Sequence, residues 1–257
     1  MTKYIAKKVD ANGHINFSPE ENETWKILFE RQIEVVQTRA CPEYLLGLKK
    51  LNMAHDHIPQ CDEISKVLRA ETGWSVVPVQ AIIPLEDFFG LLANRQFPAA
   101  SIIRTREDLD FLQEPDIFHE YFGHCPLLTN KAYADFIQWY GEHALKTNRK
   151  AQSFLGRLFW YTIEFGLIET DAGLRIFGGG ILSSFKESFY SLDSAEPKHH
   201  AFDVDKMLAT PYFYDRIQTN YFVLSSMEQL FELKTDAIIS KVEHLIQESQ
   251  AENFVIC

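Results

Sequence analysis

The chain has 257 residues, of which 46% are hydrophobic and 13% aromatic, so it can bury a substantial core. Its formal net charge of −11 argues against a nucleic-acid partner, because phosphate binding needs clustered lysine and arginine. No apolar run is long enough to span a membrane, the N-terminus lacks a signal-peptide core, and the four cysteines have no disulfide-framework spacing, so we expect a cytoplasmic protein with free thiols.

Helical patterns dominate the chain. The first helix is expected to begin at Ser18-Pro19-Glu20-Glu21, because serine caps a helix, proline suits its first position and acidic residues favour its first turn. Further helices are expected at residues 42–51, 60–72, 85–94, 131–146, 153–165 and 227–249, with helix or loop at 183–191.

A few short extended segments lie between these helices. They are expected at residues 74–84, 100–105 and 221–224, with a hairpin at 167–177 and a polar loop at 193–200. The sequence has no internal repeat, low-complexity tract or convincing linker. We therefore predict one mainly α domain with a few short β-strands, spanning residues 1–257.

The most informative motif is a short helix between Pro115 and Pro126. Pro115 suits its first turn, and Pro126 marks the point where it should end. The motif contains His119, Glu120 and His124, so the histidines are five residues apart rather than four as in zinc peptidases. A zinc hydrolase that uses Glu120 as its general base remains a remote alternative.

An α-helix would separate the two histidine directions by about 140°. Both rings could reach one ion if His124 lay at a frayed helix end, where Gly123 and Pro126 let the backbone turn. A third donor is Glu164, the one carboxylate in an apolar helical segment, where a glutamate is costly unless it is paired or binds a metal. Two histidines and one carboxylate are typical of non-haem ferrous oxygenases. A salt bridge between Glu164 and Arg157 is the structural alternative.

Three motifs together resemble the aromatic amino acid hydroxylases in their short, single-domain bacterial form. They are residues 114–124 (EPDIFHEYFGH), 160–167 (WYTIEFGL) and 179–187 (GGILSSFKE), and the similarity continues from about Trp74 to Phe231. The resemblance implies the single-domain catalytic fold of that family, without a regulatory domain, as a monomer or weak dimer.

The resemblance also implies an activity. We expect an iron- and tetrahydropterin-dependent monooxygenase that uses dioxygen to hydroxylate L-phenylalanine to L-tyrosine. Tetrahydrobiopterin or a related pterin would be the co-substrate, and the physiological role would be phenylalanine catabolism. Tryptophan or tyrosine hydroxylation is the alternative within the family.

Residue roles carried over from the family fall on the three motifs and their surroundings. The iron ligands would be His119, His124 and Glu164, and Ser183 would hydrogen-bond the first histidine. Arg104 would bind the substrate carboxylate while Asp116 holds that arginine. The remaining expected contacts are Trp160, Gly180 and Ser183 for the substrate, and Phe88, the main chain at Ile82 and Ile83, and Glu120 for the pterin.

Overall fold

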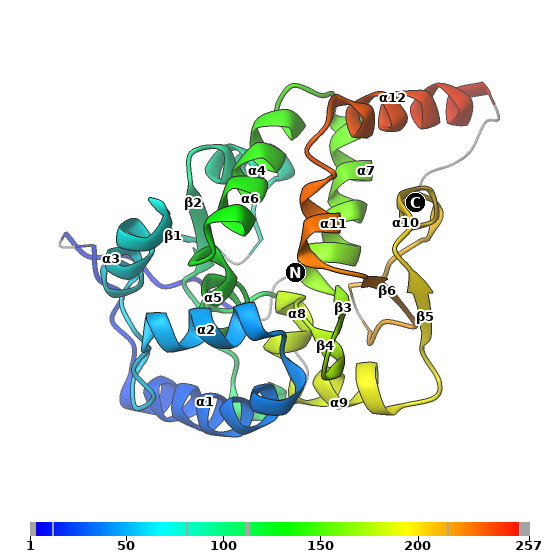
Figure 1. The fold of residues 1–257 in the computed structure, drawn as a ribbon. Helices are drawn as coiled ribbons and strands as arrows, with labels where there is room; N and C mark the ends of the chain where they lie inside the picture. Colours follow the sequence, from blue (N-terminus) through cyan, green and yellow to red (C-terminus); the bar gives the residue numbers. More distant parts are fainter. Residues whose placement is uncertain (1–3, 12, 81, 111–113, 215, 252–257) are drawn as a thin grey trace.

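The computed structural model describes residues 4–11, 13–80, 82–110, 114–214 and 216–251. Helices make up most of this part of the chain, as the sequence predicts (Figure 1). The main helices are α1 (Pro19–Arg39), α2 (Pro42–Leu51), α3 (Cys61–Thr72), α4 (Leu85–Ala93), α6 (Lys131–Ala144), α7 (Arg149–Phe159), α9 (Phe185–Asp193), α10 (Val204–Ala209), α11 (Met227–Phe231) and α12 (Asp236–Ala251). Within the described residues, no helix combines the length and apolarity that a membrane span requires.

The first helices begin and end at the predicted signals. The Ser18 hydroxyl accepts a hydrogen bond from Glu21 N, and the Glu21 carboxylate accepts one from Ser18 N at 2.6 Å, which completes a capping box. Helix α3 ends at Gly73, whose φ of 79° is in the left-handed region that glycine adopts without strain. The structure confirms these two boundaries. They could be predicted because capping depends on residues that are neighbours in the sequence.

Two small sheets accompany the helices. Strands β1 (Ser75–Val79) and β2 (Gln96–Ala100) form a parallel pair. The larger sheet has the order β4-β3-β6-β5, formed by β3 (Leu167–Thr170), β4 (Gly173–Ile176), β5 (Lys198–Ala201) and β6 (Asn220–Leu224). The predicted hairpin is β3–β4, and the predicted strand at 221–224 is β6.

Four local predictions need correction. The strand expected at 100–105 ends at Ala100, because Arg104 N donates to the Asp116 carboxylate and Ile102 O accepts from Ile117 N, so these groups bond to a turn instead of a sheet. The loop expected at 193–200 contains the start of β5, which pairs with β6. The helix expected at 227–249 is interrupted between α11 and α12, and the one expected at 153–165 begins at Arg149 and ends in a π-helical turn.

The segment that carries the two histidines lies in the middle of the core. Phe118 stacks on Phe122 with ring centroids 4.9 Å apart, and Trp25 of α1 packs edge-on against Phe118. The Tyr44 hydroxyl of α2 donates to Phe122 O at 2.6 Å. Because neighbours on several sides hold this segment, its histidine side chains are presented from a rigid support.

Candidate metal centre and substrate cavity

The histidine motif folds as a π-helical turn rather than as an α-helix with a frayed end. The helix begins at Ile117, and Asp116 caps it by accepting a hydrogen bond from His119 N at 2.9 Å. Residues His119–His124 (η2) are π-helical, with Cys125 N donating to Glu120 O. This i to i+5 pattern brings residues five apart onto one face. The spacing that weakened a metal pair in an α-helix therefore suits one here.

The two prolines also behave differently from the prediction. Pro115 lies before the capping residue, outside the helix, rather than in its first turn. Pro126 does not end the helix, because the chain continues directly into α5 (Cys125–Leu128), where Pro126 occupies the first turn. Pro126 has no N–H to donate to the π-helical turn before it, and Phe122 O, four residues earlier, accepts a hydrogen bond from the Tyr44 hydroxyl instead.

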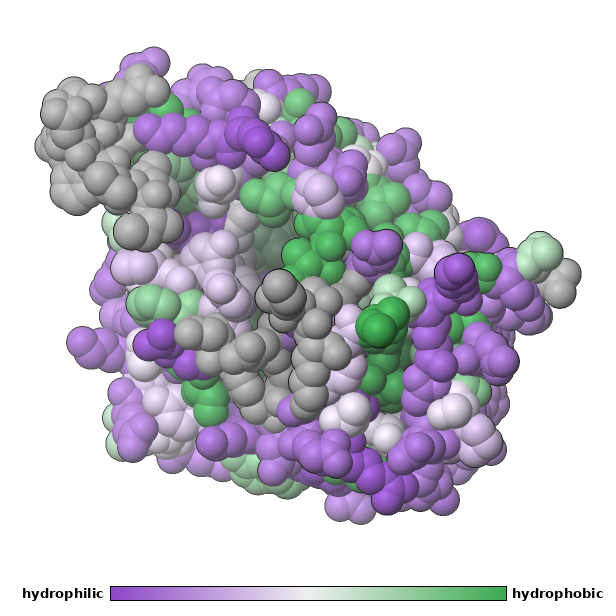
Figure 2. Space-filling view, turned by 180° about the vertical axis from the view of Figure 1, so that it is seen from behind, coloured by the Kyte–Doolittle hydropathy of each residue, from purple (hydrophilic) through white to green (hydrophobic). Residues whose placement is uncertain are grey.

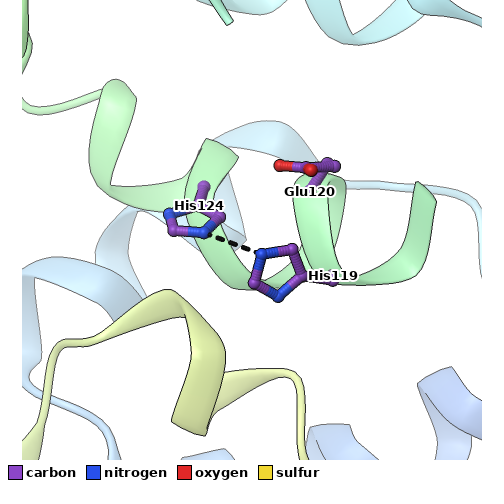
Figure 3. A group of neighbouring side chains, drawn as sticks. All are labelled: His119, Glu120 and His124. Carbon is purple, nitrogen blue, oxygen red and sulfur yellow. Dashed lines mark hydrogen bonds between the residues drawn. The ribbon is translucent and has the colours of Figure 1, made fainter. Parts of the chain in front are cut away.

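The two imidazole rings meet edge to edge at the turn. His119 Nε2 and His124 Nε2 are 3.1 Å apart, and Figure 3 shows the rings turned toward one another. For a metal–nitrogen distance of about 2.1 Å, two donors at right angles around one ion are about 3.0 Å apart. The donor spacing therefore fits a shared metal ion.

A carboxylate from a second π-helical turn completes the group. Residues Trp160–Glu164 (η3) follow α7, and Phe165 N donates to Trp160 O. The Glu164 carboxylate oxygens lie 3.2 Å from His124 Nε2 and 3.6 Å from His119 Nε2. Arg157, the alternative partner predicted for Glu164, donates instead to Leu208 O.

Glu120 is a competing third donor, because one of its oxygens lies within 4.8 Å of ring nitrogens of both histidines (Figure 3). Burial, together with the charges of Glu164 and Asp116, raises the pKa of Glu120 well above its usual value. Burial also acts to raise the pKa of Glu164, but the two histidines outweigh it and the net pKa is lowered. Glu164 is therefore the ionised and closer carboxylate, and it suits a cation better than Glu120 does.

His119 is a neutral imidazole whose Nε2 lone pair is available to a metal ion. Burial lowers its pKa to about 4, so the ring is unprotonated on one nitrogen at neutral pH. The Ser183 hydroxyl donates to Gly179 O at 2.9 Å and lies 3.0 Å from His119 Nδ1, so it accepts a hydrogen bond from Nδ1–H. This arrangement leaves the Nε2 lone pair directed toward Glu164 and His124.

The ring of His124 packs against a glycine of α8 (Gly179–Leu182). A Cβ atom on Gly179 would lie 2.4 Å from His124 Cε1 and 2.5 Å from its Nδ1. A side chain at this position would therefore displace the ring. The neighbouring glycines have a different close contact, because a Cβ atom on Gly178 or Gly180 would lie 2.5 or 3.0 Å from Glu164 O.

We predict that Gly179→Ala lowers iron content and reduces stability by about 1–3 kcal/mol, because the added methyl group overlaps the His124 ring. Iron bound per chain after desalting and thermal unfolding would measure the two effects. Gly90→Ala is the matched control, since a Cβ there meets nothing within 4 Å. Full iron content in Gly179→Ala would contradict the prediction.

Arg104 and Asp116 form a buried ion pair beside this group. Arg104 Nε and Nη2 donate to the two Asp116 oxygens at 2.8 and 2.9 Å, and the side chains are 5% and 0% exposed. Asp116 also accepts from the backbone N of Arg104 and of His119. Four hydrogen bonds offset the cost of burying this carboxylate, and they hold the guanidinium in one orientation.

A cavity of about 560 Å³ lies in front of the histidine turn. Figure 2 shows apolar side chains gathered beside a recess on the face opposite that of Figure 1. Two of the residues predicted for the site, His124 and Asp116, are buried behind the cavity wall. The structure brings the others together as cavity lining: Ile82, Ile83, Phe88, Arg104, His119, Glu120, Trp160, Glu164, Gly180 and Ser183.

Several cavity residues were missed by the sequence analysis. The stretch before β6 contributes Tyr212, Tyr214 and Gln218, and α9 contributes Glu187. The aromatic run at 212–214 was a signal in a stretch without predicted structure, but only the fold brings it to the cavity. Glu187 is 4% exposed, and its Oε1 accepts from the Tyr221 hydroxyl at 2.7 Å and from Gln218 N at 3.2 Å.

Glu187 should make stability depend on pH. Burial raises its pKa from 4.5 to about 7, so the folded protein holds a proton that the unfolded chain has lost between these values. The free energy of unfolding should therefore fall as pH rises from about 4.5 to 7. We predict that Glu187→Gln removes this loss, which amounts to about 3 kcal/mol. Urea unfolding of both proteins at pH 5 and pH 8 would measure it, and an equal pH dependence would refute it.

Comparisons with known proteins identify the family of this chain. The sequence profile of the biopterin-dependent aromatic amino acid hydroxylase family matches residues 3–246. The chain is 52% identical over 246 residues to the phenylalanine-4-hydroxylase of Pseudomonas aeruginosa, covering 96% of this chain and 94% of that protein.

Solved structures are similar over nearly the same length. The apo structure of the cold-active phenylalanine hydroxylase from Colwellia psychrerythraea superposes with a TM-score of 0.90 at 46% identity, covering 96% of this chain and 95% of that one. The Chromobacterium violaceum phenylalanine hydroxylase with bound iron(III) and 7,8-dihydrobiopterin has a TM-score of 0.85 at 43% identity, with 89% and 84% covered. The chain therefore belongs to the biopterin-dependent aromatic amino acid hydroxylase family.

Proposed function

We propose that this protein is a phenylalanine 4-monooxygenase, which uses dioxygen and a tetrahydropterin to convert L-phenylalanine to L-tyrosine. The observation that carries the proposal is the convergence of two histidines and a glutamate at the wall of a cavity that Arg104 also lines. The similarity to bacterial phenylalanine hydroxylases along most of their length supports the choice of substrate.

In this proposal His119, His124 and Glu164 hold ferrous iron. Three protein donors on one side of the ion leave coordination positions for other ligands, and the bound ion and pterin together supply the activation of dioxygen. Ser183 holds His119 in the tautomer that presents Nε2 to the iron. The apolar side chains that line the cavity exclude water from the reacting groups.

Arg104 is the proposed partner of the substrate carboxylate. Two of its five N–H groups donate to Asp116, and the guanidinium borders the cavity, so further N–H groups can bind a carboxylate that enters there. The substrate ring would then lie against Trp160, with Gly180 and Ser183 on the cavity wall beside it.

The pterin is proposed to bind at the other side of the cavity. Phe88 would stack on its ring, and Phe159 holds Phe88 edge-on with ring centroids 5.3 Å apart. Ile82 and Ile83, whose main chain is the proposed contact, border the same space. Burial raises the pKa of Glu120 and favours its protonated form, which can donate a hydrogen bond toward the pterin, directly or through water.

We further propose that residues 1–257 form one catalytic domain that acts in the cytoplasm as a monomer or weak dimer. One continuous hydrophobic core through the described residues supports a single domain. The cysteines of the described residues, Cys41, Cys61 and Cys125, are free thiols, as expected in a reducing compartment. Analytical ultracentrifugation would measure the oligomeric state.

The deciding experiment is a turnover assay of the full chain with ferrous iron, dioxygen and a tetrahydropterin. L-phenylalanine, L-tryptophan and L-tyrosine are offered separately, and reactions without pterin serve as controls. We expect pterin-dependent tyrosine from phenylalanine. Product from tryptophan or tyrosine alone would refute the substrate, and no product from any of the three, with zinc bound, would refute the hydroxylase and favour a hydrolase.

A further inference from the structure

Trp160, Phe165 and Tyr212 form an aromatic wall of the cavity. Near this wall lies a buried acid, Glu187, which has none of the binding roles proposed above. Glu187 of α9 borders the cavity, yet it is 4% exposed. We propose that Glu187 is a positioning residue, which holds Gln218 so that Gln218 fixes the indole of Trp160 in the substrate cavity. This inference rests on the proposed function, because it assigns Trp160 to the substrate ring.

The contacts form one continuous chain. Glu187 Oε1 accepts from Gln218 N at 3.2 Å, and Gln218 Oε1 accepts from Trp160 Nε1 at 3.1 Å. Gln218 itself is 5% exposed. A displacement of Gln218 would therefore move or break its bond to the indole, because a side chain this buried has little access to bulk water as a replacement partner.

The orientation of the Gln218 amide is determined by its partners. Its Nε2 donates to Phe213 O at 2.6 Å and to Arg216 O at 3.1 Å, while its Oε1 faces the indole N–H, which can only donate. Turning the amide over would place N–H against N–H and oxygen against oxygen. Gln218 therefore joins Trp160 to the backbone that precedes β6 in one arrangement only.

Trp160 in turn organises the aromatic wall. Its ring lies 4.6 Å from Phe165 and 4.7 Å from Tyr212, centroid to centroid, with interplanar angles of 33° in both cases. Both neighbours border the cavity. A rotated indole would change the width of the space available for a substrate ring, whereas the proposed pterin side at Phe88 would keep its own packing against Phe159.

An acid at this position is costly, which argues against a merely space-filling role. Burial raises the pKa of Glu187 to about 7, and an apolar side chain would avoid that cost. The Tyr221 hydroxyl, which donates to the same oxygen at 2.7 Å, ties Glu187 to β6. Glu187 thus anchors Gln218 to the sheet and, through Gln218, the cavity wall.

The test uses the full chain labelled with ¹⁵N-tryptophan and loaded with diamagnetic zinc in place of iron. The chain has four tryptophans, and Trp160→Phe identifies the indole N–H signal of Trp160. In Glu187→Ala we expect that signal to shift or broaden while the other three stay in place. Glu187→Gln, which keeps an oxygen acceptor, should restore it, and Tyr221→Phe, which leaves the Gln218 bond intact, should not disturb it.

Kinetics of the iron-loaded variants provide a second readout. Glu187→Ala should raise the KM for L-phenylalanine about 3- to 10-fold, as for one lost hydrogen bond, with the pterin KM within about twofold of the wild type. If the alanine variant does not fold, Glu187→Asp withdraws the acceptor by one methylene and should cause the same changes to a smaller extent.

An unshifted Trp160 signal in a folded Glu187→Ala or Glu187→Asp variant would overturn the proposal. An equal rise in both KM values would also overturn it, because general loosening of the fold would then explain the effect. The spectrum does not depend on turnover. A wild-type protein that forms no tyrosine would refute the proposed function, while the Trp160 signal would still decide the role of Glu187.

Discussion

Glu164→Ala is expected to abolish both iron retention and tyrosine formation, with turnover at least about a thousandfold lower. Glu164 is the closer and ionised carboxylate, 3.2 and 3.6 Å from the two histidine nitrogens. Without it only two imidazole donors and no negative charge remain to hold a divalent cation, and the several kcal/mol that a bound metal contributes to catalysis are lost. Iron per chain after desalting and single-turnover tyrosine formation would measure the two effects.

Glu120→Gln is the matched control, because Glu120 is the other carboxyl group near the two rings. Burial raises the pKa of Glu120 and so favours its neutral form, and replacement by a neutral amide should therefore leave iron content unchanged, whereas the pterin KM should rise. If Glu120→Gln lost iron while Glu164→Ala kept it, the two carboxyl groups would exchange roles. The assignment of the third ligand would then be wrong.

Arg104→Ala is expected to raise the KM for L-phenylalanine about 10- to 100-fold, the range for the loss of a charge-assisted hydrogen bond to a carboxylate. The same change leaves Asp116, which is 0% exposed, without its cation. A stability loss of about 3–5 kcal/mol should accompany the kinetic effect. Steady-state kinetics with varied phenylalanine and urea unfolding would measure each.

A double variant separates these two consequences. Arg104→Ala combined with Asp116→Asn removes the unpaired buried charge, so it should recover much of the lost stability without recovering the phenylalanine KM. Arg31→Ala is the matched control, since Arg31 pairs with Asp110, whose side chain is 73% exposed, at the surface. A double variant with the wild-type KM for L-phenylalanine would show that Arg104 does not bind the substrate carboxylate.

Much of this protein could be predicted from the sequence wherever the relevant physics is local. The helix that begins at Ser18 depends on a capping box of neighbouring residues, and the hairpin at 167–177 on a turn around Gly173. The three candidate ligands could be selected because histidine and an isolated carboxylate in apolar helices are costly without a partner. The roles of Arg104 and Phe88, in contrast, came from the family resemblance, because an arginine or a phenylalanine alone singles out no site.

The errors arose where a segment's hydrogen bonds depend on distant partners. Residues 102–104 were predicted as a strand. Instead, Arg104 N donates to the Asp116 carboxylate and Ile102 O accepts from Ile117 N, so these groups are not available to a neighbouring strand. Pro126 was predicted to end a helix. In the structure a π-helical turn precedes it, and the chain continues through Pro126 in α5. Sequence periodicity assumes α-helical geometry, so it could not anticipate a turn in which residues five apart share a face.

The sequence by itself determined the capped start of α1 and the glycine end of α3, the mainly α composition and the choice of the three candidate metal donors, because each follows from residue type and near neighbours. Only the tertiary structure decided that His119 and His124 face one another, that Gly179 makes room for the His124 ring, and that Glu187 reaches Trp160 through Gln218. These contacts join residues up to 58 positions apart, as between Trp160 and Gln218, and they arise only when packing brings those segments together.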